Sequence, residues 1–260
     1  MSYIPVQKIK PQNAAWVDVF VTYRDDREKG ADFSPKNANA KLVQQRYCDM
    51  KKLMNVERII MPRPTHGSQI YANNPLTDEF QAPFCDKRQN ADMIYIDAVN
   101  VAGAFAPADC AVVVIMDKAK RAIGILHLGW RGLVKKNIEI YFNKFMPEPD
   151  ECQVYVALFA SQNFHLRPDE VVEFKNLDER LFTERVGENG LFDMKKLLTE
   201  QLNHVGVSSN RIEFHPDNTL TSDKYFSYSG GDEFARFLVA AKIVGDKFAD
   251  ISQSMEGEND

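Results

Sequence analysis

The chain has 260 residues, of which 44% are hydrophobic and 27% charged, as in an ordinary globular protein long enough to bury a sizeable core. Its formal net charge of −5 argues against a nucleic-acid-binding protein, which normally presents a basic face. No apolar run approaches the roughly 20 residues of a membrane span. Residues 1–12 lack the apolar core of a signal peptide, so we expect a cytoplasmic protein without membrane contact.

The first third of the chain predicts two strands and a helix. Residues 15–23 are rich in β-branched and aromatic side chains and predict a strand. Apolar residues recur at helical spacing over 38–55, which predicts an amphipathic helix. A short strand at 59–61 is broken by prolines and resumes near 69–71. His66 therefore falls in or just after a strand.

In the rest of the chain, predicted strands come in groups between predicted helices and do not alternate regularly with them. This order favours a mixed sheet over a strictly alternating βαβ fold. We expect one α/β or α+β domain over 1–260, with a frayed acidic tail at 253–260. The predicted elements are strands at 93–96, 108–116, 122–128, 153–159 and 211–214, helices beginning or running at 133–145, 168–174 and 193–205, and a strand, glycine turn and further strand or helix within 224–244.

Reactive side chains bracket two apolar runs near the middle of the chain. Cys110 precedes the first run, and His127 closes the second. Together with His66 they supply the three protein ligands of a catalytic zinc, which keeps a fourth position open and lowers the pKa of bound water to about 7. The sequence separations are far longer than in a zinc finger, so a metal site, a thiol nucleophile and simply buried side chains all remain open. The other cysteines form no CxxC pair and predict free thiols: Cys48, Cys85 and Cys152.

A second candidate feature follows His127 directly. Trp130 lies between two glycines and is followed by Arg131, which predicts a tight strand-to-helix turn. A helix N-terminus beside an arginine favours an anion. The alternative is an aromatic anchor next to a solvated arginine.

Four motifs in one order resemble a known family. The segments THGSQIY, ADMIYID, PADCAVVVIMD and ILHLGWRG are similar to the VHG, ADALVT, TADCxP and HAGWRG motifs of the polyphenol oxidase (laccase-domain), or YfiH-like, family. The resemblance covers roughly residues 15–242. It implies a four-layer α/β/β/α sandwich with mixed sheets. It also implies a zinc-containing purine nucleoside phosphorylase acting on adenosine, inosine, guanosine or methylthioadenosine with phosphate, with accompanying adenosine deaminase activity.

The resemblance also implies roles for particular residues. The family's metal ligands correspond to His66, Cys110 and His127. An upstream family arginine corresponds to Arg46, which we expect to hold phosphate together with Arg131. A carboxylate is expected to relay a proton or to orient a metal ligand. The candidates for that role are Asp92 and Asp109.

Three departures from the family pattern concern the substrate side. Tyr23 and Ser229 replace arginines, and His165 stands where a glutamate is usual. These departures leave a non-catalytic zinc-binding member as one alternative to the phosphorylase. Two further alternatives are a copper-type polyphenol oxidase and a metal-free cysteine hydrolase that uses Cys110 with His127 or His66 as base. A multicopper centre needs many histidines, and the chain has five.

Overall fold

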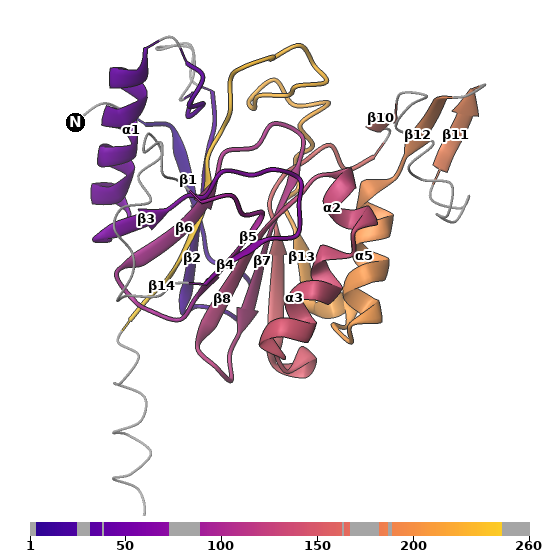
Figure 1. Ribbon diagram of the computed structural model, residues 1–260, viewed down its shortest axis with the longest axis horizontal. Coiled ribbons are helices and arrows are strands. Elements are labelled where there is room, and N and C mark those ends of the chain that lie inside the picture. Colours follow the sequence, from indigo (N-terminus) through magenta and orange to yellow (C-terminus); the bar gives the residue numbers. More distant parts are fainter. Residues whose placement is uncertain are drawn as a thin grey trace, which may run out of the picture.

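The computed structural model describes residues 4–24, 32–37, 39–72, 89–162, 164–166, 182–186 and 189–245. Two mixed β-sheets pack face to face, and helices cover the outer face of each sheet, at the left and at the right of Figure 1. The predicted four-layer α/β/β/α sandwich is confirmed. None of the helices in the described ranges is long and apolar enough to cross a bilayer.

The first sheet has five strands, and only β3 and β6 pair in parallel. Helix α1 (Ala40–Leu53) begins at Asn39, whose side chain accepts a hydrogen bond from the backbone N–H of Leu42. Its buried face packs on the sheet through Val43 and Met50. The strands in spatial order are β1 (Val6–Ile9), β2 (Val17–Thr22), β14 (Val239–Ile243), β6 (Val101–Phe105) and β3 (Arg58–Ile60).

The second sheet has six strands and carries the candidate site at one end. Strand β7 (Ala111–Asp117), in the interior of this sheet, is buried on both faces. Val112 and Val114 face the first sheet, while Val113 and Ile115 face the helices. The strands in spatial order are β13 (Ile212–Phe214), β9 (Cys152–Val156), β7 (Ala111–Asp117), β8 (Ala122–Leu128), β5 (Met93–Ile96) and β4 (Ile70–Ala72). The covering helices are α2 (Trp130–Val134), α3 (Asn137–Phe145) and α5 (Met194–His204).

The helix predicted at 133–145 is two helices in the structure. Helix α2 begins earlier, at Trp130, and the chain breaks at Lys136, whose φ is +56°. A lysine in the left-handed region costs on the order of 1–2 kcal/mol, so neighbouring contacts must hold it there. The break turns Asn137 inward, where it is fully buried and hydrogen-bonds to the chain around Gly67.

The remaining elements are short. A three-stranded antiparallel sheet is formed by β10 (Phe164–Leu166), β12 (Asn189–Phe192) and β11 (Phe182–Val186), and lies at the right of Figure 1. Single 3₁₀ turns occur at η1 (Pro149–Glu151) and η3 (Ser209–Arg211). In the last predicted segment, residues 224–238 form turns and only β14 is regular. The helix start predicted at 168–174 and the tail at 253–260 lie outside the described residues.

Candidate metal centre

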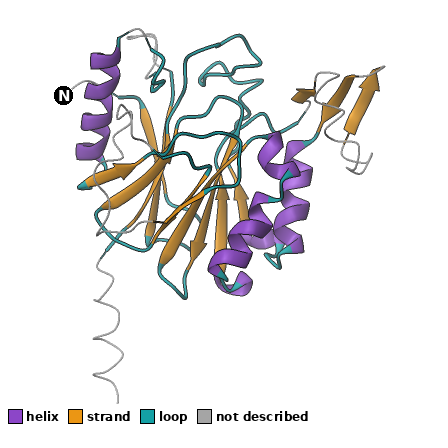
Figure 2. Ribbon diagram, in the orientation of Figure 1, coloured by secondary structure: helices purple, strands orange, loops and turns teal. Residues whose placement is uncertain are grey.

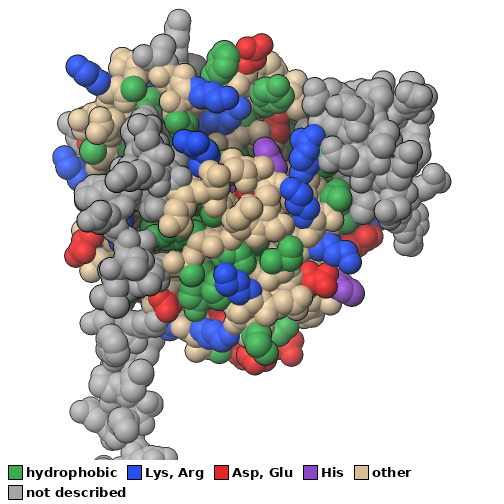
Figure 3. Space-filling model, in the orientation of Figure 1, with side chains coloured by type: hydrophobic (Ala, Val, Ile, Leu, Met, Phe, Trp, Pro, Cys, Tyr) green, Lys and Arg blue, Asp and Glu red, His purple; other side chains and the backbone are tan. Residues whose placement is uncertain are grey.

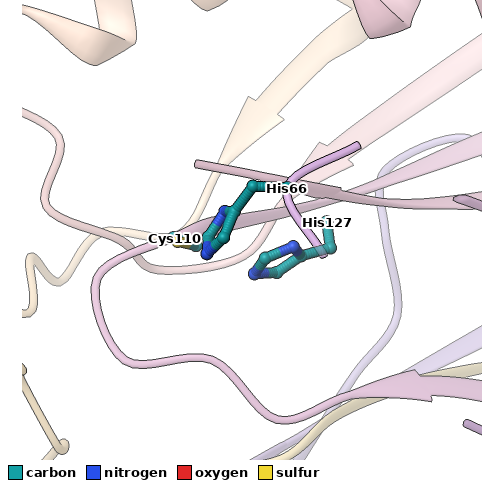
Figure 4. A group of neighbouring side chains, drawn as sticks. All are labelled: His66, Cys110 and His127. Atoms are coloured by element: carbon teal, nitrogen blue, oxygen red, sulfur yellow. The ribbon is translucent and has the colours of Figure 1, made fainter. Parts of the chain in front are cut away.

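His66, Cys110 and His127 come together as the sequence predicts. One donor atom from each of them lies within 4.8 Å of the others. Figure 4 shows the two imidazole rings approaching each other, with Cys110 beside the His66 ring. The ring centroids of His66 and His127 are 5.1 Å apart. Three donors at this separation, two nitrogens and one sulfur, fit a zinc-type ligand set.

The β7–β8 hairpin brings the cysteine and the second histidine together. Ala111 pairs with Leu128 and Val112 with His127, so Cys110 is level with Gly129. A Cβ atom on Gly129 would lie 2.8 Å from Cys110 Sγ and 3.1 Å from His66 Nδ1. Only glycine leaves room for both donors at this point.

His66 lies on a tight turn that one carboxylate organises. Its φ is +53°, in the left-handed region. The Asp92 carboxylate accepts hydrogen bonds from three consecutive backbone N–H groups, those of Thr65 at 3.0 Å, His66 at 2.9 Å and Gly67 at 2.8 Å. The Thr65 hydroxyl adds a bond of 3.1 Å. The left-handed histidine is thus fixed by contacts outside its own segment.

The same carboxylate orients the other histidine. Asp92 Oδ1 lies 3.1 Å from His127 Nδ1. Since the carboxylate is an acceptor, Nδ1 carries the proton and Nε2 is left for a metal or for Cys110. Burial alone would raise the pKa of Asp92, but the bonds from His127, Gly67 and Thr65 outweigh it and lower the pKa to about 2. Asp92 is therefore an anion at neutral pH.

The far side of the His66 turn is held by the start of α3. Asn137 Nδ2 donates to the Gly67 carbonyl at 2.7 Å, and Ser68 Oγ donates to Asn137 Oδ1 at 2.7 Å. Lys135 Nζ donates to the His66 carbonyl at 2.5 Å. The turn is therefore clamped between Asp92 on one side and the break between α2 and α3 on the other.

The two histidines have opposite electrostatic surroundings. Burial, aided by the nearby His127, Arg131 and Lys135, lowers the pKa of His66 to about 4. Burial would also lower the pKa of His127, but Cys110 and Asp92 outweigh it and raise the pKa to about 9. At neutral pH the metal-free protein therefore holds a neutral His66, ready to bind a metal, and a His127 imidazolium beside Cys110.

The three side chains open into a cavity of about 480 Å³ whose wall carries positive charge. On the face shown in Figure 3, lysine and arginine side chains gather around a histidine. The cations that line the cavity are Lys36, Arg131 and Arg236. Its other lining residues include Pro64, Pro107, Trp130, Met194, Tyr228 and Ser229. The volume lies in the range of small-molecule sites, and the cations favour an anionic ligand.

The two predicted arginines lie in different places. Arg131 lines the cavity and stacks on Trp130, with Cζ 4.0 Å from the ring centroid. Arg46 is buried in α1, and its Nη1 donates to the Asp32 carbonyl at 3.0 Å. Arg46 is not among the cavity-lining residues, so the structure separates it from the metal centre.

Asp109 lines the cavity, but its carboxylate is engaged by another segment. Its φ is +77°, which is not an extended conformation. The strand predicted to begin at residue 108 therefore begins only at Ala111, as β7. Its oxygens accept hydrogen bonds from Thr219 Oγ1, Ser227 Oγ and the backbone N–H of Ser229, each at 2.7 Å. These contacts indicate an orienting role in place of a proton relay.

The three family departures have different surroundings. Tyr23 packs against the central core, and the next residue, Arg24, pairs with Asp232 and donates to the Tyr225 carbonyl at 3.1 Å. Ser229 belongs to the segment that Asp109 holds. His165 lies in β10, and its side chain is outside the described residues.

Sequence reasoning missed the residues that support the ligands. Asn137 and Lys135 sit inside a run with helical periodicity, where nothing signals a break. Gly129 had a signal, since a glycine directly after the histidine strand indicates close approach of two segments. The sequence singled out neither Tyr228 nor Arg236, which are parts of the segments YFSY and ARF.

Known proteins resemble the chain over most of its length. A family model described as multi-copper polyphenol oxidoreductase laccase matches residues 32–242. A purine nucleoside phosphorylase of Aquifex aeolicus is 28% identical over 194 residues, which are 75% of this chain and 87% of that protein. A purine nucleoside phosphorylase of Clostridium acetobutylicum is 24% identical over 216 residues, or 81% of this chain and 86% of that protein.

Two solved structures share the fold at low identity. The hypothetical protein YfiH of Bacillus licheniformis aligns with a TM-score of 0.78 and 16% identity, over 87% of this chain and 92% of the other. YlmD from Geobacillus stearothermophilus aligns with a TM-score of 0.79 and 16% identity, over 89% of this chain and 93% of the other.

Proposed function

Because the chain belongs to the multi-copper polyphenol oxidoreductase laccase family, we propose that it is a metal-dependent purine nucleoside phosphorylase built on His66, Cys110 and His127. The observation that carries the proposal is the meeting of this ligand set with a cationic cavity. The printed names of the relatives from Aquifex aeolicus and Clostridium acetobutylicum supply the reaction class.

Zinc is the metal that these donors favour. Two histidine nitrogens and one thiolate make a three-ligand set of the kind that catalytic zinc sites use. When bound, zinc acts as a Lewis acid on an oxygen and lowers the pKa of a bound water to about 7. The chain's own part is to hold the donors: Asp92 fixes His127 and the His66 turn, and Gly129 leaves the space between Cys110 and His66.

The proposed reaction uses the positive wall of the cavity. A phosphate oxygen forms a bond to C1′ of the ribose, the C1′–N9 bond breaks, and the purine leaves with the electron pair and takes a proton at nitrogen. Arg131 and Lys36 line the cavity, and in this proposal their charges lower the free energy of a bound phosphate dianion. We extend the proposal to deamination of adenosine in the same cavity, in which water adds at C6 and ammonia leaves.

Metal content and base release test this function directly. The purified protein is analysed for zinc and copper and incubated with adenosine, inosine, guanosine and methylthioadenosine, each with and without phosphate. We expect one zinc per chain, phosphate-dependent release of base, and loss of both zinc and turnover in His127→Ala. Less than stoichiometric zinc together with unchanged activity of His127→Ala would refute the proposal.

One observation favours a second candidate, a metal-free cysteine hydrolase. His127 hydrogen-bonds to Cys110 and, through Nδ1, to Asp92, which is the thiol, base and orienting acid of a nucleophilic triad. If this candidate holds, iodoacetamide alkylates Cys110 rapidly and a chelator changes neither alkylation nor activity.

Copper in place of zinc in the metal analysis would support the oxidase alternative. Stoichiometric zinc with no turnover of any nucleoside would support a non-catalytic member.

A further inference from the structure

A tyrosine stands exposed in the wall of the cavity that holds the candidate metal ligands. Tyr228 lines this cavity together with His66, Cys110 and His127. Its side chain lies in a segment of turns without regular structure, residues 224–238, yet the residue is 61% exposed. A single exposed aromatic residue is ordinary on a protein surface. What distinguishes Tyr228 is how firmly the backbone around it is held.

One buried carboxylate fixes the residues on both sides of this tyrosine. Asp109 is 5% exposed. It accepts a hydrogen bond from Ser227 Oγ and another from the backbone N–H of Ser229, both at 2.7 Å. Because Asp109 directly precedes Cys110, the backbone that carries Tyr228 is attached to the backbone that carries a metal ligand. Asp109 therefore links the position of the Tyr228 backbone to that of Cys110.

A second carboxylate holds the same segment from the other side. Asp232 accepts a hydrogen bond from the backbone N–H of Ser227 at 2.9 Å and forms an ion pair with Arg24. Arg24 in turn donates to the Tyr225 carbonyl and lies over the Phe226 ring, with Cζ 4.6 Å from its centroid. A ring carried on such a segment loses little further backbone freedom when a ligand covers it.

An arginine lies over the Tyr228 ring and is itself held by hydrogen bonds. Arg236 Cζ is 5.9 Å from the centroid of Tyr228, and its guanidinium donates to the Asp232 carbonyl at 3.2 Å and the Ala235 carbonyl at 2.7 Å. The cavity wall at this point thus presents an aromatic face next to a fixed cation. A planar base carrying an anionic or carbonyl edge fits this pair of groups.

We propose that the purine base of the substrate stacks on Tyr228, and that Asp109 is the positioning residue that holds this ring at its distance from the metal centre. The inference rests on the proposed function, because a nucleoside is what brings a planar base into the cavity. Stacking is tolerant of substituents, since every purine offers a π face. Tyr228 therefore favours a planar base over a bare sugar and does not choose among purines.

Direct binding measurements separate stacking from the rest of substrate recognition. Zinc-loaded protein is titrated calorimetrically with inosine and with methyl β-D-ribofuranoside, which has the sugar but no base. The variants are Tyr228→Leu, Tyr228→Phe and, as a matched control, Phe234→Leu. Phe234 is 57% exposed in the same segment and does not line the cavity.

We expect Tyr228→Leu to weaken inosine binding by about 5- to 150-fold, the range measured for loss of one base–aromatic stack. Tyr228→Phe and Phe234→Leu bind inosine within about threefold of the unchanged protein, because a ring remains in the cavity wall in both. Riboside affinity and zinc content stay the same in all three variants. Equal inosine affinity of Tyr228→Leu and the unchanged protein would overturn the proposal, and so would an equal loss of riboside affinity.

The role of Asp109 has its own test. Asp109→Asn keeps an acceptor for the Ser227 hydroxyl but places an amide NH₂ opposite the backbone N–H of Ser229. We expect a higher KM for inosine with little change in kcat and unchanged zinc content. We also expect little additional loss of affinity when Asp109→Asn is combined with Tyr228→Leu, because both changes remove the same contact. Additive losses in the double variant would refute positioning through the tyrosine.

Measurements on the unchanged protein distinguish failure of the proposed function from failure of the stacking role. If the zinc-loaded chain neither binds nor turns over any purine nucleoside, the proposed function and the stacking role both fall. If it binds inosine and Tyr228→Leu binds equally well, only the stacking role falls.

Discussion

Replacing Asp92 by asparagine tests the central structural claim about the metal centre. Asp92 Oδ2 accepts hydrogen bonds from the backbone N–H groups of Thr65 and Gly67, while Oδ1 accepts from the backbone N–H of His66 and from His127. An asparagine has one accepting oxygen and one donating NH₂. Whichever way its amide turns, two of these donors face another donor.

The contacts of Asp92 indicate how much Asp92→Asn should lower the free energy of unfolding and the affinity for metal. A buried donor without a partner costs about 1–3 kcal/mol, so Asp92→Asn should lower the free energy of unfolding of the metal-free protein by about 2–6 kcal/mol. The lowered pKa of about 2 gives a similar scale, since it corresponds to roughly 2 kcal/mol of preference for the ionised carboxyl in the fold. Loss of an orienting carboxylate weakens metal binding by about 10- to 100-fold.

Zinc affinity is measured by competition with a chromogenic chelator, and stability by urea unfolding of the metal-free protein. The matched control is Asp117→Asn. Asp117 is 3% exposed and accepts a backbone hydrogen bond from Lys120, at the end of β7 remote from Cys110. We expect the control to lose stability and keep its zinc affinity. If Asp92→Asn binds zinc as tightly as the control does, the carboxylate does not orient the ligands.

Three further predictions concern the support of the same centre. Asn137→Ala removes two hydrogen bonds to the His66 turn, and we expect about tenfold weaker zinc binding in the chelator competition; unchanged affinity would mean that Asp92 and Lys135 hold the turn without Asn137. Gly129→Ala puts a methyl group 2.8 Å from Cys110 Sγ, and we expect the purified variant to carry much less zinc by elemental analysis while its urea midpoint stays near that of the parent. Since the folded-state pKa of Asp92 is about 2 and its ordinary value 3.8, its contribution to the stability of the metal-free protein is complete above about pH 4 and is lost as the pH falls toward 2; urea midpoints between pH 5 and pH 2 should fall less steeply for Asp92→Asn than for the parent.

Two of the three candidate ligands could be predicted to lie close together because their signals are local. Cys110 and His127 each adjoin an apolar run, and two such runs in succession predict neighbouring strands. The β7–β8 pairing confirms that they are adjacent. His66 was recruited through the ordered motifs, since 44 residues separate it from Cys110 and no periodicity joins them. The layered fold also followed from the resemblance and is confirmed.

The supporting residues could not be predicted, because their roles depend on contacts distant in the chain. Asn137 lies about 70 residues from the Gly67 carbonyl that it binds, and the left-handed Lys136 that turns it inward has no sequence signal. Arg46 matched a motif position, but a position in a motif does not say which way a guanidinium points. In the structure it binds the Asp32 carbonyl. Its role in phosphate binding stays a prediction that the cavity does not support.

The turn that carries His66 has the form of a phosphate-binding loop. Consecutive backbone N–H groups at Thr65, His66 and Gly67 converge on one point, as they do in concavities that bind external anions. Here the anion is supplied from within the chain by Asp92. The N–H groups of this turn are therefore already engaged, and any anion that enters the cavity meets the cationic side chains of its wall, such as Arg131 and Lys36, in place of this concavity.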